Sequence, residues 1–518
     1  MMQRYVAAML VSLALPIAAQ PAGAPPSGEQ IQHEVRAWRQ AHEREILREY
    51  VDLLAVPNLA RDAANIRTNA ERVAALLSRR GVKTRLLDGQ GGPPVVYGER
   101  LLPKATRTVV VYAHYDGQPV DPAQWTTPPW KPVLRDGPLE GGGREVSLEG
   151  EGPIGPEWRL YARSASDDKA PAIALAAALD ALEANERQPS INLKIFFEGE
   201  EEAGSPHLRA VLENNKELLK ADLWLLCDGP VHQTRRPQVF FGARGVTDVA
   251  ITLYGPKRTL HSGHYGNWAP NPGVLAAQLV ASMRDADGRI LIDGFYDDVR
   301  PIGEVERKAL SSVPDNDADL RRELALGASE AGGASLAERI LLPALNLRGI
   351  ASGHVGAAAA NAIPTEAQIS IDFRLVPDQT PERVRERVDR HVEKQGYFLV
   401  DEPPSEDVRR AHPRVALVRW GSGGYPAART PLDQPIAKAF LETLDEALGT
   451  KVVAMPTLGG SIPMNVFQEV LHTPIVGLPL ANHDNNQHAA DENIRIQNLW
   501  DGIEAYAGVI ARLGFKLE

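Results

Sequence analysis

The sequence predicts an α/β protein with a largely parallel sheet, interrupted by a smaller α+β module. Short continuous apolar runs alternate with helical patterns in the first half of the chain, as expected for strands buried on both faces. Residues 367–373 instead alternate apolar and polar side chains, which indicates a strand with one solvated face. The alternation of strands and helices resumes after residue 424, so the module interrupts one α/β layer.

Two helices open the first part, and strand–helix pairs follow them. Gly81 ends the second helix at the position where glycine is favoured. The helices are expected at residues 29–54, 65–80, 170–184 and 206–219, and the strands at residues 82–87, 108–113, 192–197 and 223–226.

The pattern changes after Gly245 and returns after a Gly-Ser-Gly-Gly linker at 421–424. The module should contain strands at 246–254 and 367–373 and helices at 272–283 and 381–394, while the Ala/Gly-rich residues 323–360 predict no fold. A helix after Pro435, strands near 452 and at 473–476, and a helix at 494–513 follow. The expected divisions are a signal peptide at 1–19, a first catalytic part at 20–244, a lid or dimerisation domain at 245–420 and a second catalytic part at 421–518.

Length and charge limit the function classes. A chain of 518 residues suggests roughly two to four domains. Its 43% hydrophobic and 24% charged residues are typical of a soluble globular protein. The net charge is -11, and the chain has no long basic run, so we expect neither nucleic acid nor a membrane as partner.

The N-terminus has the pattern of a secretory signal peptide. Arg4 precedes a mostly apolar stretch at 5–18, and small residues allow cleavage after Ala19. An ordinary apolar helix is the alternative. We therefore expect an exported protein, periplasmic or secreted. The single cysteine, Cys227, lies in an apolar run and is expected to be a buried small hydrophobe.

Candidate metal ligands follow the predicted strands, where open α/β sheets bind ligands. His114 and Asp116 come directly after strand 108–113; imidazole binds zinc well, and a carboxylate often supports its other nitrogen. A chance loop histidine is the alternative. Asp167, in Ser-Asp-Asp-Lys before a helix, could bridge two metals or could simply cap that helix.

A run of glutamates follows strand 192–197. Adjacent carboxylates at the end of a buried strand repel each other unless cations neutralise them. One glutamate can then bind metal while its neighbour accepts a proton from water; a solvated acidic loop is the alternative. Asp228 follows strand 223–226 but could be a turn residue, and His488 has a competitor in His483.

This ordered set resembles the di-zinc hydrolase family of carnosinase, aminoacylase, glutamate carboxypeptidase and succinyl-diaminopimelate desuccinylase. Gly-Gly-Ser-Ile-Pro at 459–463 and Leu-His-Ser-Gly at 260–263 are most similar to the branch of the cytosolic non-specific dipeptidase and carnosinase. The resemblance covers most of the chain, through residues 109–117, 160–171, 197–205, 260–266, 369–377 and 459–463.

The resemblance implies a phosphorylase/hydrolase-like catalytic domain, a mixed sheet flanked by helices, and a ferredoxin-like lid or dimerisation domain. It implies two Zn²⁺ per subunit, with Co²⁺ or Mn²⁺ as alternatives, and a homodimer. The implied roles are: His114 and Asp228 on one metal, Glu202 and His488 on the other, Asp167 bridging, Glu201 as general base, Asp116 orienting His114, Arg374, Gly460 and Ser461 binding the substrate carboxylate, and His261 reaching the partner subunit's site.

The chain departs from the family pattern beside these positions, although no implied ligand is lost. Ala162 and Ser164 stand where the family has glycines around Arg163, and Ala170 replaces another glycine. Asp491-Glu492 replaces Asn-Glu after the last histidine. Glu200 adds a third glutamate to the run, which leaves the base and the ligand within it to be distinguished.

We therefore expect an exported di-zinc metallopeptidase that hydrolyses dipeptides or small peptides with a free C-terminal carboxylate. Guanidinium binds carboxylates bidentately, so Arg374 favours such substrates, unless it forms only a surface salt bridge. The alternatives are an N-acyl-amino-acid amidohydrolase of the aminoacylase type and a non-catalytic zinc-dependent binding protein.

Overall fold

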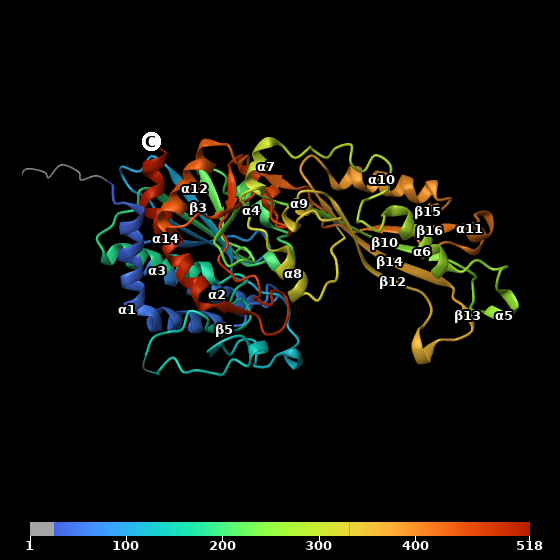
Figure 1. Cartoon of the computed structure of the whole chain (residues 1–518), viewed down its shortest axis with the longest axis horizontal. Helices are drawn as coiled ribbons and strands as arrows, with labels where there is room; N and C mark the ends of the chain where they lie inside the picture. Colours follow the sequence, from blue (N-terminus) through green and yellow to red (C-terminus); the bar gives the residue numbers. More distant parts are fainter. Residues whose placement is uncertain (1–24, 151, 331, 518) are drawn as a thin grey trace, which may run out of the picture.

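The structure is a computed structural model that describes residues 25–150, 152–330 and 332–517. Two layered halves lie side by side along the long axis (Figure 1). The predicted signal peptide, residues 1–19, falls outside the described residues. Among the described residues, no helix combines the length and the hydropathy that crossing a membrane requires.

An eight-stranded mixed sheet, the large sheet, forms the first half. Its order is β1-β2-β6-β3-β7-β19-β8-β18. Central strand β3 runs parallel to β6 and β7, whereas β1, β2 and β6 pair antiparallel at one edge. The strands are β1 (Lys83–Leu87), β2 (Val95–Arg100), β3 (Thr108–His114), β6 (Asn192–Glu198), β7 (Leu223–Leu226), β8 (Gln238–Phe240), β18 (Val453–Met455) and β19 (Ile475–Gly477).

Helices cover both faces of the large sheet. Along β3, Val109 and Val111 join one apolar cluster and Val110 and Tyr112 the other, because successive side chains of a strand point to opposite faces. The first face carries α1 (Gly28–Leu54), α2 (Ala63–Ser78), α3 (Ala170–Ala184), α12 (Pro435–Leu448) and α14 (Ile496–Lys516), and the second carries α4 (Leu208–Asn214) and α13 (Met464–Leu471). The predicted mixed sheet flanked by helices is confirmed.

A five-stranded sheet, the small sheet, forms the second half, in the order β12-β14-β10-β16-β15. The predicted alternation holds along β14, where Ile369, Ile371 and Phe373 are buried. Helices α6 (Pro272–Met283) and α10 (Pro381–Lys394) pack on this face. The strands are β10 (Gly245–Tyr254), β12 (Ala344–Ala351), β14 (Glu366–Leu375), β15 (Phe398–Val400) and β16 (Val415–Trp420). The domain boundaries at 245 and 420 stay a prediction.

Residues 304–340, here named the cap, leave the small sheet and pack against the large one (Figure 1). The cap contains α7 (Glu304–Leu310), α8 (Asp317–Glu323) and α9 (Leu336–Ile340). Val313 and Ala337 pack against an apolar cluster of the large sheet. Two hydrogen bonds from Arg429, to Glu306 at 3.4 Å and to Thr457 at 3.2 Å, tie α7 to the segment after β18. The stretch 323–360, which predicted no fold, thus completes the cap and forms edge strand β12.

Candidate metal centre

The acidic and imidazole residues meet where neighbouring strands of the large sheet end. His114 ends β3, and Asp228 follows β7 two residues beyond its end. Asp167 lies between β5 (Arg159–Tyr161) and α3, while His488 precedes β20 (Asn493–Arg495). Because β20 pairs antiparallel with β5, segments more than 300 residues apart in the sequence are held together. Sheet pairing therefore brings the five predicted ligands to one place.

Two groups of three side chains could each hold a metal ion. His114, Asp168 and Asp228 form one, and Asp167, Glu202 and His488 the other. Within each group the ligand atoms lie within 4.8 Å of one another. All five predicted ligands are included. Asp168 is an additional candidate that sequence reasoning missed, although it stands in the Ser-Asp-Asp-Lys motif.

Asp167 belongs to the second group and also contacts the first. Its Oδ1 atom is 2.9 Å from His114 Nε2, and its Oδ2 atom is 3.0 Å from His488 Nε2. His488 Nε2 is also 3.3 Å from Glu202 Oε2. One carboxylate oxygen therefore faces each group, which is the arrangement of a bridging ligand.

The electrostatics of the cluster fit bound cations. Burial raises the pKa of Glu202 to about 9, and the charge of Asp167 adds to the rise. Burial, again with the charge of Asp167, raises the pKa of Asp228 to about 6. Glu202 Oε1 is buried and finds no hydrogen-bond partner among the described residues. Oxygen and imidazole donors of this kind suit Zn²⁺, and a cation would remove the repulsion that these carboxylates experience.

Glu201 lies beside both groups without belonging to either. Its Oε2 atom is 4.0 Å from His114 Nε2, and its side chain is 16% exposed and borders a cavity. Burial raises its pKa well above the usual range. Asp116 supports this arrangement twice. Its carboxylate lies 3.3 Å from His114 Nδ1 and accepts the backbone N–H groups of Glu201 and Glu202, each at 3.1 Å.

The two competing residues of the sequence analysis have other partners. Glu200 accepts the backbone N–H of His207 at 3.0 Å and lies 3.0 Å from its Nδ1 atom, so its carboxylate is engaged away from the ligand groups. His483 is in neither ligand group, whereas His488 is.

Glu492, a buried residue that sequence reasoning noted only as part of a departure, fixes the Asp167 loop. Its carboxylate accepts the N–H groups of Ser164, Ser166 and Asp167, each at 2.9 Å, and pairs with Arg163 at 2.7 Å. Ser164 adopts φ = 62°, a left-handed conformation that glycine adopts more readily. The Glu492 contacts thus hold a loop in which serine replaces the family's glycine.

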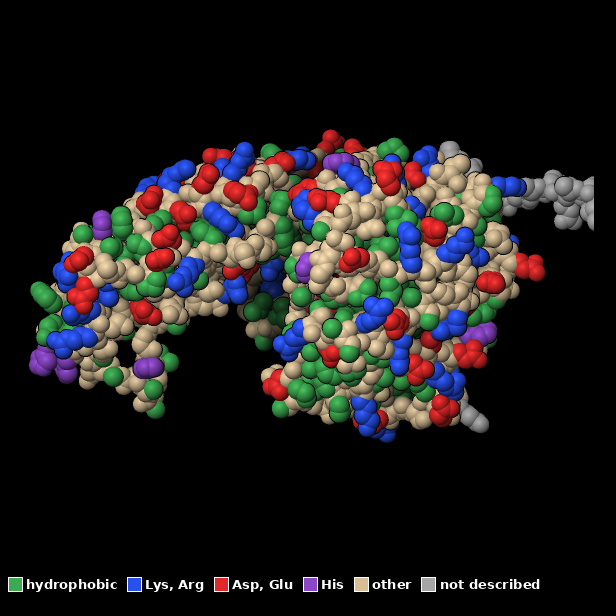
Figure 2. Space-filling model, turned by 180° about the vertical axis from the view of Figure 1, so that it is seen from behind, with side chains coloured by type: hydrophobic (Ala, Val, Ile, Leu, Met, Phe, Trp, Pro, Cys, Tyr) green, Lys and Arg blue, Asp and Glu red, His purple; other side chains and the backbone are tan. Residues whose placement is uncertain are grey.

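The predicted carboxylate-binding residues border the same cavity, of ≈ 1070 Å³, as Asp167, Glu201, Asp228 and His488. Arg374, on β14 of the small sheet, donates to Ser461 Oγ at 2.8 Å and to Asp372 at 3.1 Å. Gly460 lies beside Ser461 in the lining. The cavity therefore opens where the two halves meet, and Figure 2 shows the hollow between them.

Arg244 is a second cation near Arg374 that the sequence analysis missed. Its Nε atom donates to the Gly459 carbonyl at 2.8 Å. Burial, with the charge of Arg374, lowers the Arg244 pKa to about 10. Two guanidinium groups share one nearby carboxylate, Asp372. Their excess positive charge favours an anionic ligand group at this side of the cavity.

His261 is not brought to the cluster within its own chain. It lies in β11 (Leu260–His261), next to α5 (Ser262–Tyr265) at the far end of the small sheet (Figure 1). The side chain is exposed, and its Nδ1 accepts the Gly263 N–H at 3.1 Å.

Comparisons with known proteins agree with this geometry. Residues 110–512 match peptidase family M20/M25/M40. The Cys-Gly metallodipeptidase dug1 of Schizosaccharomyces pombe is 26% identical, over 89% of this chain and 92% of that protein. The human Beta-Ala-His dipeptidase is 27% identical, over 82% of this chain and 78% of that protein.

Solved structures share the fold. The M20 family metallo-carboxypeptidase Sso-CP2 from Sulfolobus solfataricus superposes with a TM-score of 0.72 at 28% identity, over 91% of this chain and 99% of that one. Human carnosine dipeptidase 1 gives a TM-score of 0.72 at 23% identity, over 95% of this chain and 100% of that one.

The same comparisons correct the predicted location. Export to the periplasm or the medium was predicted from the N-terminal residues, and this prediction is wrong, because the similar Dug1 dipeptidases of yeasts are cytosolic. An apolar N-terminal stretch next to one arginine was a weak basis, since such a pattern also occurs in ordinary helices. With the family matched over residues 110–512 and the five predicted ligands gathered in one cluster, this chain belongs to peptidase family M20/M25/M40 and is a metal-dependent hydrolase.

Proposed function

We propose that the protein is a di-zinc dipeptidase that hydrolyses the amide bond of dipeptides or small peptides with a free C-terminal carboxylate. One observation carries the proposal. The two groups of candidate ligands, which Asp167 connects, border the same cavity as Arg374. The dipeptidase names of the yeast and human relatives agree with it.

His114 and Asp228 would hold one metal, Glu202 and His488 the other, and Asp167 both; Asp168 is within reach of the first. Zinc ions bound there would polarise the scissile carbonyl and lower the pKa of water. Arg374, with Ser461 and the Gly460 backbone, would bind the carboxylate of the substrate and so align the peptide in the cavity.

Glu201 would act as general base. It borders the cavity, belongs to neither ligand group and is held at its backbone by Asp116. It would accept the proton of the attacking water and pass it to the leaving amine nitrogen. Asp116 would in addition orient the His114 ring.

The proposal includes a homodimer built through the small sheet, with His261 acting in the partner's site. β12 is the edge strand of that sheet, and on it Leu347 is 40% and Ile350 45% exposed. An unpaired edge strand with exposed apolar side chains is a ready surface for another chain. His261 directly precedes α5, which lies at the end of the small sheet away from the large sheet (Figure 1), and this position supports action across the interface.

A substrate panel tests the reaction. The zinc-reconstituted protein should hydrolyse free dipeptides, with products identified by mass spectrometry, and should act poorly on the matching C-terminal amides and on N-acyl amino acids. Preferential cleavage of N-acyl amino acids would instead support an aminoacylase-type enzyme.

Mixed dimers test the assembly. His261→Ala and Glu201→Gln should each be nearly inactive alone. Co-expressed in one dimer, the two chains place both defects in one site and leave the other intact, so activity should partly return. Absence of recovery, in a preparation that contains mixed dimers, would contradict a role for His261 in the partner's site.

A further inference from the structure

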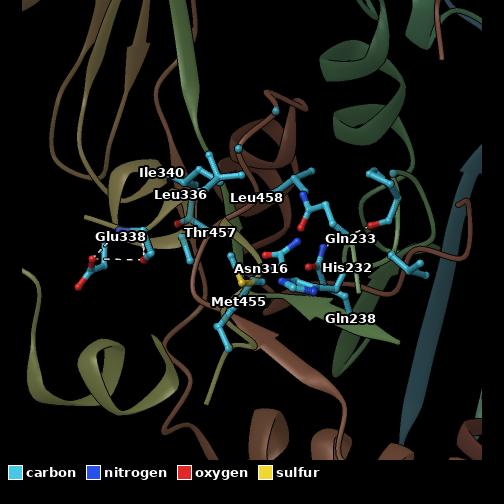
Figure 3. Close-up of a pocket in the computed structure, with 18 of the residues that line it drawn as sticks. His232, Gln233, Gln238, Asn316, Leu336, Glu338, Ile340, Met455, Thr457 and Leu458 are labelled. Atoms are coloured by element: carbon cyan, nitrogen blue, oxygen red, sulfur yellow. Dashed lines mark hydrogen bonds between the residues drawn. The ribbon is translucent and has the colours of Figure 1, made fainter. Parts of the chain in front are cut away.

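The cavity continues past the metal cluster to a second end, which the proposed reaction does not use. Small-ligand sites span about 300–1,000 Å³, and this cavity measures ≈ 1070 Å³. Its far end lies between the cap and the segment that follows β18 (Figure 3). There is thus room for a substrate side chain beyond the atoms that meet the metals.

Large apolar side chains line this end from both walls. Leu336 and Ile340 come from α9 of the cap, and Met455 and Leu458 come from β18 and the turn after it (Figure 3). Leu336 is 42% exposed, so much of its apolar side chain is open to solvent at this end of the cavity. A ligand that covers it would gain the free energy of removing this surface from water.

Several polar groups at the same end have hydrogen-bond partners within their own wall of the cavity. Glu338 accepts the Ser335 N–H at 2.9 Å, which caps α9, and Asp317 accepts the Leu336 N–H at 3.2 Å. On the opposite wall, His232 Nδ1 lies 2.8 Å from Thr234 Oγ1, and Gln238 donates to the Pro230 carbonyl at 3.3 Å. These bonds stabilise the walls. Asn316 and Gln233 also belong to the lining (Figure 3), so a ligand at this end would meet apolar side chains beside a few polar ones.

Charge at the cap disfavours acidic ligands. The cap contributes three carboxylates, Asp315, Asp317 and Glu338, and one cation, Arg307, to the lining, so negative charge is in excess there. A substrate carboxylate there would meet like charges and would lose water on entering an apolar space. An uncharged apolar side chain experiences neither the repulsion nor the unfavourable loss of water.

We propose that the cap and the segment after β18 form a subsite for a large apolar side chain of the peptide substrate, of the size of leucine, methionine or phenylalanine. The inference rests on the proposed dipeptidase function and deepens it. It makes the cap, through Leu336, a determinant of side-chain selectivity.

The test compares kcat/KM of the zinc-loaded enzyme for Leu-Gly, Gly-Leu, Glu-Gly, Gly-Glu and Gly-Gly. Leucine at one of the two positions should raise kcat/KM over glycine by about tenfold or more, and glutamate should not. Leu336→Asn should reduce this leucine preference several-fold, and Leu336→Arg should shift the preference toward glutamate at the same position. Leu324→Asn is the matched control, because Leu324 is 60% exposed on the same cap outside the lining.

The outcomes separate the two claims. If no dipeptide is hydrolysed, the proposed function is wrong and the subsite falls with it. If dipeptides are cleaved but leucine and glycine give equal rates at both positions, the function stands and the subsite is wrong. The subsite is also wrong if Leu336→Asn and Leu336→Arg, with wild-type melting temperatures, keep the wild-type selectivity.

Discussion

The two ends of the cavity are built in opposite ways. The metal end is charged and buried, and strand ends of the large sheet hold its side chains through hydrogen bonds to their neighbours. The cap end presents large apolar side chains and is partly exposed, and it is formed by the short helices of the cap together with the segment after β18. From this difference we infer that the metal end determines the reaction and that the cap end determines which substrates react.

Removing the metals should reduce the hydrolytic activity more than any substitution, because it acts directly on the metal end of the cavity. Chelation should abolish hydrolysis, because the clustered carboxylates need cations and the reaction needs the metals. Elemental analysis of the active protein should approach two metals per chain, and the melting temperature should fall when they are removed. Full activity of the chelated, metal-free protein would contradict the claim that the metal end carries out the reaction.

Glu492→Gln should weaken zinc binding at the metal end without replacing a candidate ligand. The amide cannot pair with the Arg163 charge or accept all three loop N–H groups as strongly. Zinc affinity should fall by about 10–100-fold, as for other residues that support ligands. Competition with a zinc-binding dye would measure this.

Glu200→Gln is the control for that experiment, since Glu200 pairs with His207 outside the ligand groups. Its zinc affinity should stay close to that of the unmodified protein. Equal losses in both variants would mean that Glu492 has no special role in positioning Asp167.

Arg374→Ala should produce a smaller and substrate-dependent loss, because the proposed contact of Arg374 is with the substrate carboxylate and not with a metal. A charge-assisted hydrogen bond contributes about 1.5–3 kcal/mol, so KM for free dipeptides should rise about tenfold or more. The rates for C-terminal amides should change little. An equal loss for free and amidated substrates would show that Arg374 does not bind the carboxylate.

Most of the candidate ligands could be named from the sequence because they stand next to a strong local pattern. His114 and Asp228 follow continuous apolar strands, whose carboxyl ends must meet at one edge. Glu492 was missed because its role depends on Arg163, 329 residues earlier in the chain. A contact between residues so far apart in the sequence leaves no local pattern that could predict it.

The cap could not be predicted for a related reason. Helices of five to seven residues, such as α7, α8 and α9, are unstable alone and form because they pack on the large sheet. The Arg429 contacts to Glu306 and Thr457 join three separate segments, so no single stretch carries the signal. The segments that hold selectivity were thus the least predictable.

The most direct test of the account is the turnover of Glu201→Gln protein that carries two zinc ions per chain. Glutamine has nearly the same size but cannot accept the proton, so the rate of dipeptide hydrolysis should fall by about a hundredfold or more, while zinc content and melting temperature stay unchanged. Zinc-loaded Glu201→Gln protein with a rate near that of the unmodified enzyme would show that Glu201 is not the base and would contradict the proposed mechanism.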